Sequence, residues 1–130
     1  MLFPRINICL VFAFFIFASC SAQNNNPVDI SATDFEAKLK NQPGILVDVR
    51  TPKEFTIGHI AGAVNMNLFD DDFNERILKL DTAKTIYVYC AVGGRSSEAA
   101  ELLLKSGYKK VYNLKRGITG WKEMNLPVEK

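Results

Sequence analysis

The sequence has little cysteine, no excess of either charge and, after its first twenty residues, no long apolar run. Only Cys90 of the three cysteines lies beyond residue 20, so a domain built from the rest of the chain contains no internal disulfide. The 16 lysines and arginines nearly balance the 14 acidic residues, which argues against a nucleic-acid partner, because such a partner requires a basic face. No later segment approaches the roughly 20 apolar residues that span a bilayer as a helix.

The N-terminus has the features of an export signal. A single positive charge, Arg5, precedes an unbroken apolar run, Ile8–Phe17, and small residues follow, which is the order typical of a secretory signal peptide. Residues 17–20 (FASC) resemble a bacterial lipobox, which implies cleavage before Cys20 and attachment of lipid to its thiol. The alternative is an ordinary signal peptide cut near Ala22, which would discard Cys20.

This interpretation divides the chain into three parts: a lipoprotein signal peptide over residues 1–19, the lipidated Cys20 with a polar tether over residues 20–27, and a domain over residues 28–130. The 111 residues that follow the signal suit one compact domain. We expect an exported protein that meets the membrane only through its N-terminal lipid. Ser21 replaces the aspartate associated with inner-membrane retention, so we expect the outer membrane, with the domain facing the periplasm.

Strand and helix patterns alternate along residues 28–130. Ile45–Val47 is a continuous apolar run typical of a buried strand, and Thr85–Tyr89 is rich in β-branched and aromatic residues. Further strands are expected at Ala63–Val64 and Lys110–Leu114, and helices from Ser31 to about Asn41, from Thr51-Pro52, over Phe69–Leu80 and from a cap at Ser96 to about Ser106. This order predicts an α/β fold: a three-layer parallel sheet of about five short strands with helices on both faces.

Cys90 directly follows the Thr85–Tyr89 strand, at the end where ligands gather in parallel sheets. Two glycines in the next four residues allow a tight turn whose N–H groups point inward and form an anion-binding nest. The helix start adds unpaired N–H groups, and Arg95 adds a fixed positive charge. Such settings lower the pKa of a cysteine from about 8.5 to as little as about 3.5. We therefore expect a partly exposed thiolate facing a small oxyanion pocket; the alternative, a buried and inert cysteine, does not account for the Gly-Gly-Arg-Ser continuation.

The chain from about Val28 to its end resembles the rhodanese homology domain. The matching segments keep the order and spacing of that family: Leu46–Arg50, Glu54-Phe55, Gly58–Asn65, Ile86–Cys90, Gly93, Arg95-Ser96, Val111–Leu114, Gly117 and Trp121. The resemblance implies a cysteine, here Cys90, that takes sulfane sulfur from a donor such as thiosulfate or a persulfide. It would hold that sulfur as a persulfide and pass it to a thiophilic acceptor such as cyanide or a thiol.

The resemblance makes Cys90 the catalytic residue. It places the donor in the loop that follows, formed by Ala91, Val92, Gly93, Gly94, Arg95 and Ser96. This chemistry requires no metal or organic cofactor. The expected partners are a small sulfur-donor anion or persulfide and a thiol or thioredoxin-like acceptor, and we expect a monomer.

Three polar residues outside the loop are expected to support the structure. Asp48 and Arg50 follow a buried strand, and Glu54 is a candidate partner for Arg50. His59, the only histidine, lies between two glycines, and a structural hydrogen-bonding role is favoured over that of a general base.

The loop departs from the family pattern in its charge. Many members have a basic residue where this chain has Ala91, so Arg95 is its only cation and a persulfide is expected to be a better donor than thiosulfate. Arg116 also replaces a common glycine. Four residues separate Cys90 from Arg95, whereas a phosphatase and arsenate-reductase branch of the same fold has five, so the loop fits sulfur better than phosphate.

Two other functions remain as alternatives to the sulfurtransferase. The first is a non-enzymatic persulfide carrier or protein-binding module of the envelope. The second is an oxidant or metalloid sensor.

Overall fold

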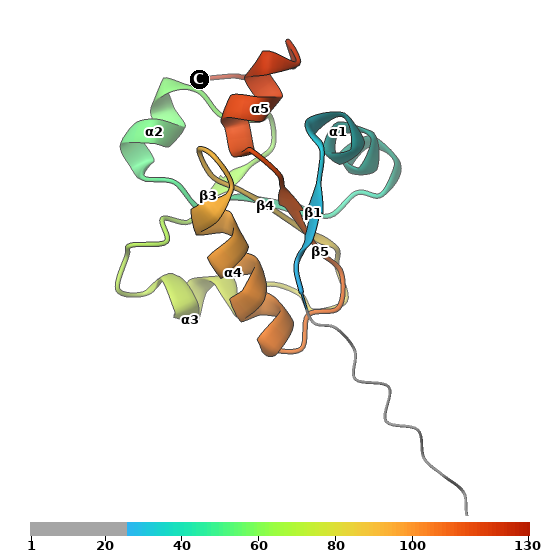
Figure 1. The fold of residues 1–130 in the computed structure, drawn as a ribbon. Helices are drawn as coiled ribbons and strands as arrows, with labels where there is room; N and C mark the ends of the chain where they lie inside the picture. Colours follow the sequence, from blue (N-terminus) through green and yellow to red (C-terminus); the bar gives the residue numbers. More distant parts are fainter. Residues whose placement is uncertain (1–25) are drawn as a thin grey trace, which may run out of the picture.

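A computed structural model describes residues 26–130, which form one five-stranded sheet with helices on both faces (Figure 1). Every strand pairing is parallel, and the order across the sheet is β1-β5-β4-β2-β3. The strands are β1 (Val28–Ile30), β2 (Ile45–Asp48), β3 (Val64–Asn65), β4 (Ile86–Tyr89) and β5 (Val111–Leu114). The helices are α1 (Ala32–Asn41), α2 (Pro52–Ile57), α3 (Phe73–Ile77), α4 (Gly94–Lys105) and α5 (Gly117–Glu123). The predicted three-layer α/β architecture is therefore confirmed.

The expected signal peptide, the lipid site Cys20 and most of the tether lie outside the described residues. Within residues 26–130, no helix is long and apolar enough to cross a membrane.

The first two helices begin at the residues that the sequence predicts. The Ser31 hydroxyl accepts a hydrogen bond from the Asp34 N–H at 3.2 Å, which caps α1. Thr51 and Glu54 form a complete capping box at the start of α2, and Pro52 occupies the first helical position. These starts were predictable because each depends on groups within three residues of one another.

Four elements differ from the prediction. The edge strand β1 was not predicted, because its three residues are exposed or half-buried and show no buried run. Helix α3 begins at Phe73 rather than Phe69, because Asn67 accepts the Phe69 N–H and holds the preceding residues in turns. Helix α4 begins two residues before Ser96, and α5 was not predicted, since two glycines weaken its helical pattern.

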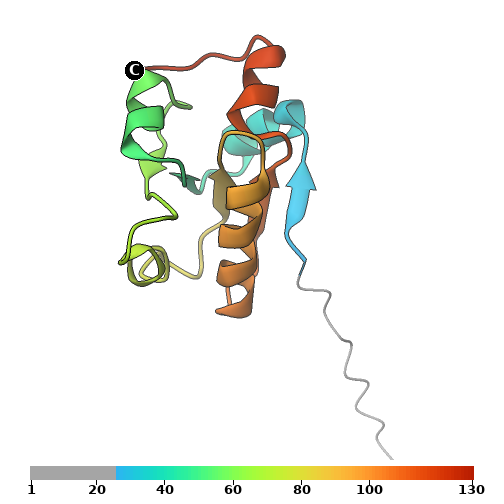
Figure 2. The same cartoon turned by 60° about the vertical axis from the view of Figure 1, so that its left-hand side comes forward.

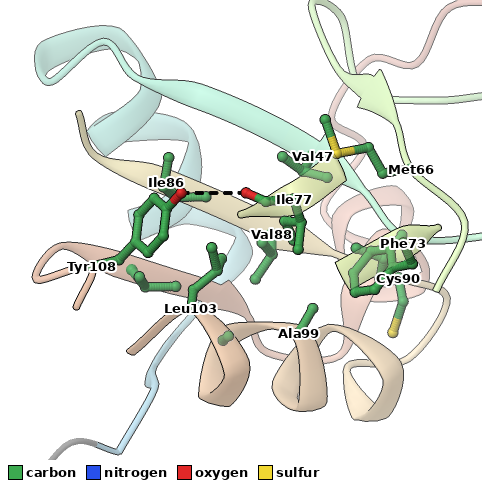
Figure 3. Close-up of a cluster of buried hydrophobic side chains, with 13 residues drawn as sticks. Val47, Met66, Phe73, Ile77, Ile86, Val88, Cys90, Ala99, Leu103 and Tyr108 are labelled. Carbon is green, nitrogen blue, oxygen red and sulfur yellow. Dashed lines mark hydrogen bonds between the residues drawn. The ribbon is translucent and has the colours of Figure 1, made fainter. Parts of the chain in front are cut away.

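The core lies in two layers, one on each face of the sheet. Along β4, Ile86 and Val88 point to the face covered by α3 and α4, whereas Tyr87 and Tyr89 point to the face covered by α1 and α5 (Figures 1 and 3). All four side chains are fully buried, which is the alternation expected of a central strand. Cys90 continues this alternation onto the α4 face.

Because all five strands are parallel, their carboxyl ends meet at one edge of the sheet. The loop between β4 and α4 lies at this edge, together with the loops that follow β2 and β5. Strand β1 begins at the opposite edge, so the chain enters the domain at the end remote from the Cys90 loop (Figure 2).

Candidate functional site

Cys90 lies at the rim of the core, with its sulfur directed toward the start of α4 (Figure 3). The residue is only 1% exposed, so the prediction of a partly exposed thiol is wrong. The physical reason is tertiary: the side chain continues the buried face of β4, beside Phe73 of α3, and its backbone carbonyl is held by α5.

The Cys90 sulfur is surrounded by donors from its own loop. The Gly93 N–H donates to Sγ with N···S 3.1 Å, and the Ser96 hydroxyl donates with O···S 3.3 Å. Burial raises the pKa of the thiol, but hydrogen bonds from the Ser96 hydroxyl and from the N–H groups of Ser96, Gly93 and Val92 outweigh it and hold the pKa below the ordinary cysteine value. The site therefore stabilises a sulfur anion although it is buried.

Gly93, rather than Ser96, is the N-cap of α4. Its φ of 108° is accessible to glycine and strained for other residues. This turn frees Ser96, which is buried in the first helical turn, so that its hydroxyl contacts Sγ and also lies 3.2 Å from the Gly93 carbonyl oxygen. The sequence predicts Ser96 as the helix cap, but the structure places its side chain against the thiol.

Arg95 does not point an unpaired charge at the nest. Its two terminal nitrogens donate to both carboxylate oxygens of Glu54, at 2.8 and 3.0 Å. Its guanidinium also lies over the ring of Phe69, 5.8 Å from the centroid. The expectation that Glu54 pairs with Arg50 is therefore wrong, because Arg50 is already bound elsewhere.

Arg50 forms a buried pair with Asp48 at the end of β2. Its Nη2 donates to Asp48 at 2.6 Å and to the Gly58 carbonyl at 2.8 Å, while the Nε donates to both Asp48 oxygens at 3.0 Å. The guanidinium also lies over the ring of Tyr89, whose hydroxyl accepts the Ile60 N–H. This network joins β2, β4 and the chain after α2 at the edge that carries Cys90.

The remaining loop residues differ in exposure. Val92 is 69% exposed and Gly94 is exposed, whereas Ala91 is half-buried. The Ala91 carbonyl accepts from Thr119 N–H at 3.1 Å, and the Cys90 carbonyl accepts from Ile118 N–H at 2.9 Å. The first turn of α5 thus binds the backbone at the thiol, a contribution that sequence analysis missed although Gly117 and Trp121 were among the matching positions.

The contacts of His59 lie away from the thiol. Its ring stacks on Phe55 with centroids 3.8 Å apart, Nδ1 lies 3.0 Å from the Phe55 carbonyl oxygen, and Nε2 lies 3.4 Å from a carboxylate oxygen of Glu129. Its backbone pairs with that of Glu129. None of these contacts, all of them within the described residues, is with Cys90. The structure places His59 where α2 meets the C-terminal residues.

The arrangement can hold an anionic sulfur among N–H and O–H donors at a strand end. Residues 26–130 contain no group of three or more His, Cys, Asp or Glu side chains placed to hold a metal ion.

Comparison of the sequence and the fold with known proteins shows the family of this chain. The rhodanese-like domain family matches residues 31–124. The uncharacterized protein YqhL of Bacillus subtilis is 35% identical over 115 residues, which cover 88% of this chain and 90% of that protein. The tRNA uridine(34) hydroxylase of Prochlorococcus marinus is 33% identical, but the match covers only 37% of its length and 78% of this chain. The crystal structure of a rhodanese-related protein from Thermoplasma volcanium superposes with a TM-score of 0.70 and 31% identity, covering 78% of this chain and 97% of that one. The chain belongs to the rhodanese-like domain family.

Proposed function

We propose that this protein is a sulfurtransferase that carries sulfane sulfur as a persulfide on Cys90. The observation that carries the proposal is the donor set at Sγ, because the hydrogen bonds from Gly93 and Ser96 hold the pKa of a buried thiol below its ordinary value. A buried cysteine without such donors has a raised pKa and is a poor nucleophile. Membership of the rhodanese-like family supports the same chemistry.

The reaction has two displacement steps at sulfur. In the first, the Cys90 thiolate attacks the terminal sulfur of the donor, the new S–S bond forms as the old bond breaks, and the leaving group takes the bonding pair. Thiosulfate would release sulfite, and a persulfide RSS⁻ would release the thiolate RS⁻. In the second step, an acceptor thiolate or cyanide attacks the outer sulfur and Cys90 leaves as the thiolate. No net oxidation occurs, and the donors from Gly93 and Ser96 stabilise the anion in both steps.

The surroundings of Cys90 favour a persulfide over thiosulfate as the donor. Ala91 and Val92 supply no cation, and Arg95 is paired with Glu54, so no unpaired positive side chain of the loop remains for a dianion. The cysteine is 1% exposed, so only a terminal atom of a donor reaches Sγ in this conformation. The sulfane sulfur is a terminal atom in both donors, so it is the lower negative charge of a small persulfide that favours it over thiosulfate.

A second function, that of a persulfide carrier without rapid turnover, is favoured by the same burial. A sulfur bonded to a residue that is 1% exposed is protected from water and from most acceptors. In that case a specific partner protein, rather than a small thiol, would remove the sulfur. A phosphatase reaction is disfavoured by the short spacing between Cys90 and Arg95.

We also propose that the domain works at the cell envelope, anchored through lipid on Cys20. Strand β1 begins at the edge of the sheet opposite the Cys90 loop, so an anchored domain would present the thiol away from the membrane. Membrane fractionation of the wild type and of Cys20→Ala tests the anchor, and unchanged membrane association of the variant would contradict it.

The sulfur-transfer experiment uses the full chain purified in detergent. Thiosulfate and hydroxyethyl persulfide are offered separately with cyanide as acceptor, thiocyanate is followed, and intact mass reports one added sulfur. Cys90→Ser is the matched control, since serine is close to cysteine in size and its hydroxyl can accept the same hydrogen bonds. Turnover that the variant loses supports the enzyme, and stable added sulfur without turnover supports the carrier. A folded protein that shows neither turnover nor added sulfur would refute both the enzyme and the carrier. Substantial hydrolysis of a phosphate ester would also refute both.

A further inference from the structure

We infer that Glu54 determines the donor specificity of this site: its carboxylate neutralises Arg95 and so restricts Cys90 to donors of low negative charge. The inference rests on the proposed sulfur transfer and goes beyond it, because it assigns donor selection to a residue of α2, outside the Cys90 loop.

The geometry leaves Arg95 little capacity to bind an anion. Its Nη1 and Nη2 are both committed to Glu54, at 3.0 and 2.8 Å, and the ring of Phe69 lies against the guanidinium. Arginine binds oxyanions best through two parallel N–H groups, and here a carboxylate of the protein occupies that position. An oxyanion donor would have to displace Glu54 to bind at the same pair of N–H groups.

Glu54 remains ionised throughout the physiological range. The hydrogen bond from Arg95 is the largest influence on its pKa, and with those from Thr51 it outweighs burial and lowers the pKa to about 2. The thiolate of Cys90, the carboxylate of Glu54 and the guanidinium of Arg95 therefore sum to one negative charge. A thiosulfate dianion meets net repulsion at this site, whereas a monoanionic or neutral persulfide meets much less.

Glu54 also has a local structural role, which the test must separate from its charge. One of its oxygens accepts from the N–H and the hydroxyl of Thr51, at 3.0 and 2.9 Å, in the capping box of α2. Glutamine serves equally well at this position of a capping box, so Glu54→Gln keeps the cap and removes the charge and one acceptor of Arg95. Thr51→Ala does the reverse: it removes the hydroxyl of the cap and keeps the charge.

The first measurement compares donors in the full chain. Glu54→Gln is expected to raise kcat/KM for thiosulfate about tenfold, mainly through a lower KM, and to change kcat/KM for hydroxyethyl persulfide by no more than about threefold, because the effect scales with the charge of the donor. Glu36→Gln is the matched control, because it makes the same change of charge in an exposed pair with Lys40 on α1. It is expected to leave both donors unchanged. A Glu54→Gln protein that loses both activities in parallel would overturn the inference and assign Glu54 to positioning alone.

A second measurement does not depend on sulfur transfer. Cys90 is alkylated with iodoacetate, an anion, and with iodoacetamide, its neutral analogue, and the ratio of the two rates reports the local potential. Glu54→Gln is expected to raise the iodoacetate to iodoacetamide ratio severalfold, and Thr51→Ala is expected to leave it unchanged. An unchanged ratio in Glu54→Gln, or an equal change in Thr51→Ala, would overturn the inference. A raised ratio without transfer from any donor would refute the proposed function and support the charge effect.

The wild type supplies a test that needs no substitution. Salt screens the repulsion between a negative site and a dianion, so kcat/KM for thiosulfate is expected to rise between low and physiological ionic strength. A rate that falls with added salt would show that thiosulfate is attracted to the site, and would overturn the inference even if Glu54→Gln fails to fold.

Discussion

Replacing Gly117 by alanine is expected to displace the backbone at Cys90, because this glycine lies where the first turn of α5 meets the loop. A Cβ built on Gly117 would overlap the Cys90 carbonyl oxygen and lie 2.5 and 2.6 Å from the carbonyl carbon and oxygen of Ala91. These are backbone atoms that cannot rotate away. Gly117 also has a φ of 55°, which an alanine adopts only at a cost.

The expected loss of stability is about 2–4 kcal/mol. Overpacking of a close contact costs about 1–3 kcal/mol, and a left-handed backbone adds about 1 kcal/mol for a residue with a Cβ. Small domains have a free energy of unfolding of about 5–15 kcal/mol, so the variant is expected to fold. Relief of the overlap must move Cys90 or α5, and a displacement of about 1 Å at a reacting group costs on the order of 100-fold in rate.

The assay pairs urea unfolding with sulfur transfer, and Gly62→Ala is the matched control. Gly62 also has a positive φ, 81°, but a Cβ there meets no atom within 4 Å. We therefore expect Gly62→Ala to lose only about 1 kcal/mol and to retain transfer. If Gly117→Ala is no less stable than Gly62→Ala and transfers sulfur at the same rate, the close approach of α5 to the loop does not position Cys90, and the reasoning fails.

Three further predictions concern the polar groups. Ser96→Ala is expected to raise the pKa of Cys90 toward the ordinary value, because the largest of the hydrogen bonds that lower it is lost, and the pH dependence of iodoacetamide alkylation measures this; an unchanged profile would contradict it. Asp48→Asn is expected to cost about 3–5 kcal/mol in urea unfolding, because it leaves the Arg50 guanidinium buried without its counter-charge; a loss below 1 kcal/mol would be too small for this role. The folded-state pKa of Glu54, about 2, lies below its ordinary value of 4.5, so its contribution to stability, about 1 kcal/mol after solvent screening, is complete above pH 5 and is lost as the pH falls toward 2. The stability difference between the wild type and Glu54→Gln should shrink over that interval, and a constant difference would contradict the prediction.

The features that could be predicted from the amino-acid sequence are those that depend on neighbouring residues. The β-branched and aromatic residues of β4 specify a strand, the hydroxyls of Ser31 and Thr51 specify two helix starts, and the alternation of strands and helices specifies a parallel sheet with covered faces. The position of Cys90 at a strand end followed from the same pattern. Each of these inferences holds because the interaction that decides it spans only a few residues.

The surroundings of the thiol, in contrast, follow from contacts between residues that are far apart in the chain. Glu54 has Arg50 four residues before it, yet it pairs with Arg95, 41 residues away, because the fold buries Arg50 against Asp48 and brings α2 beside the loop. The burial of Cys90 and the hydrogen bond from α5 to its carbonyl could likewise not be predicted from the sequence. Helix α5 is short and weakly patterned, and it follows the loop by more than 20 residues. Pairing between distant charged groups depends on which strand ends become neighbours. Local periodicity does not encode that choice. In this protein the choice pairs Glu54 with Arg95 and so sets the charge of the site.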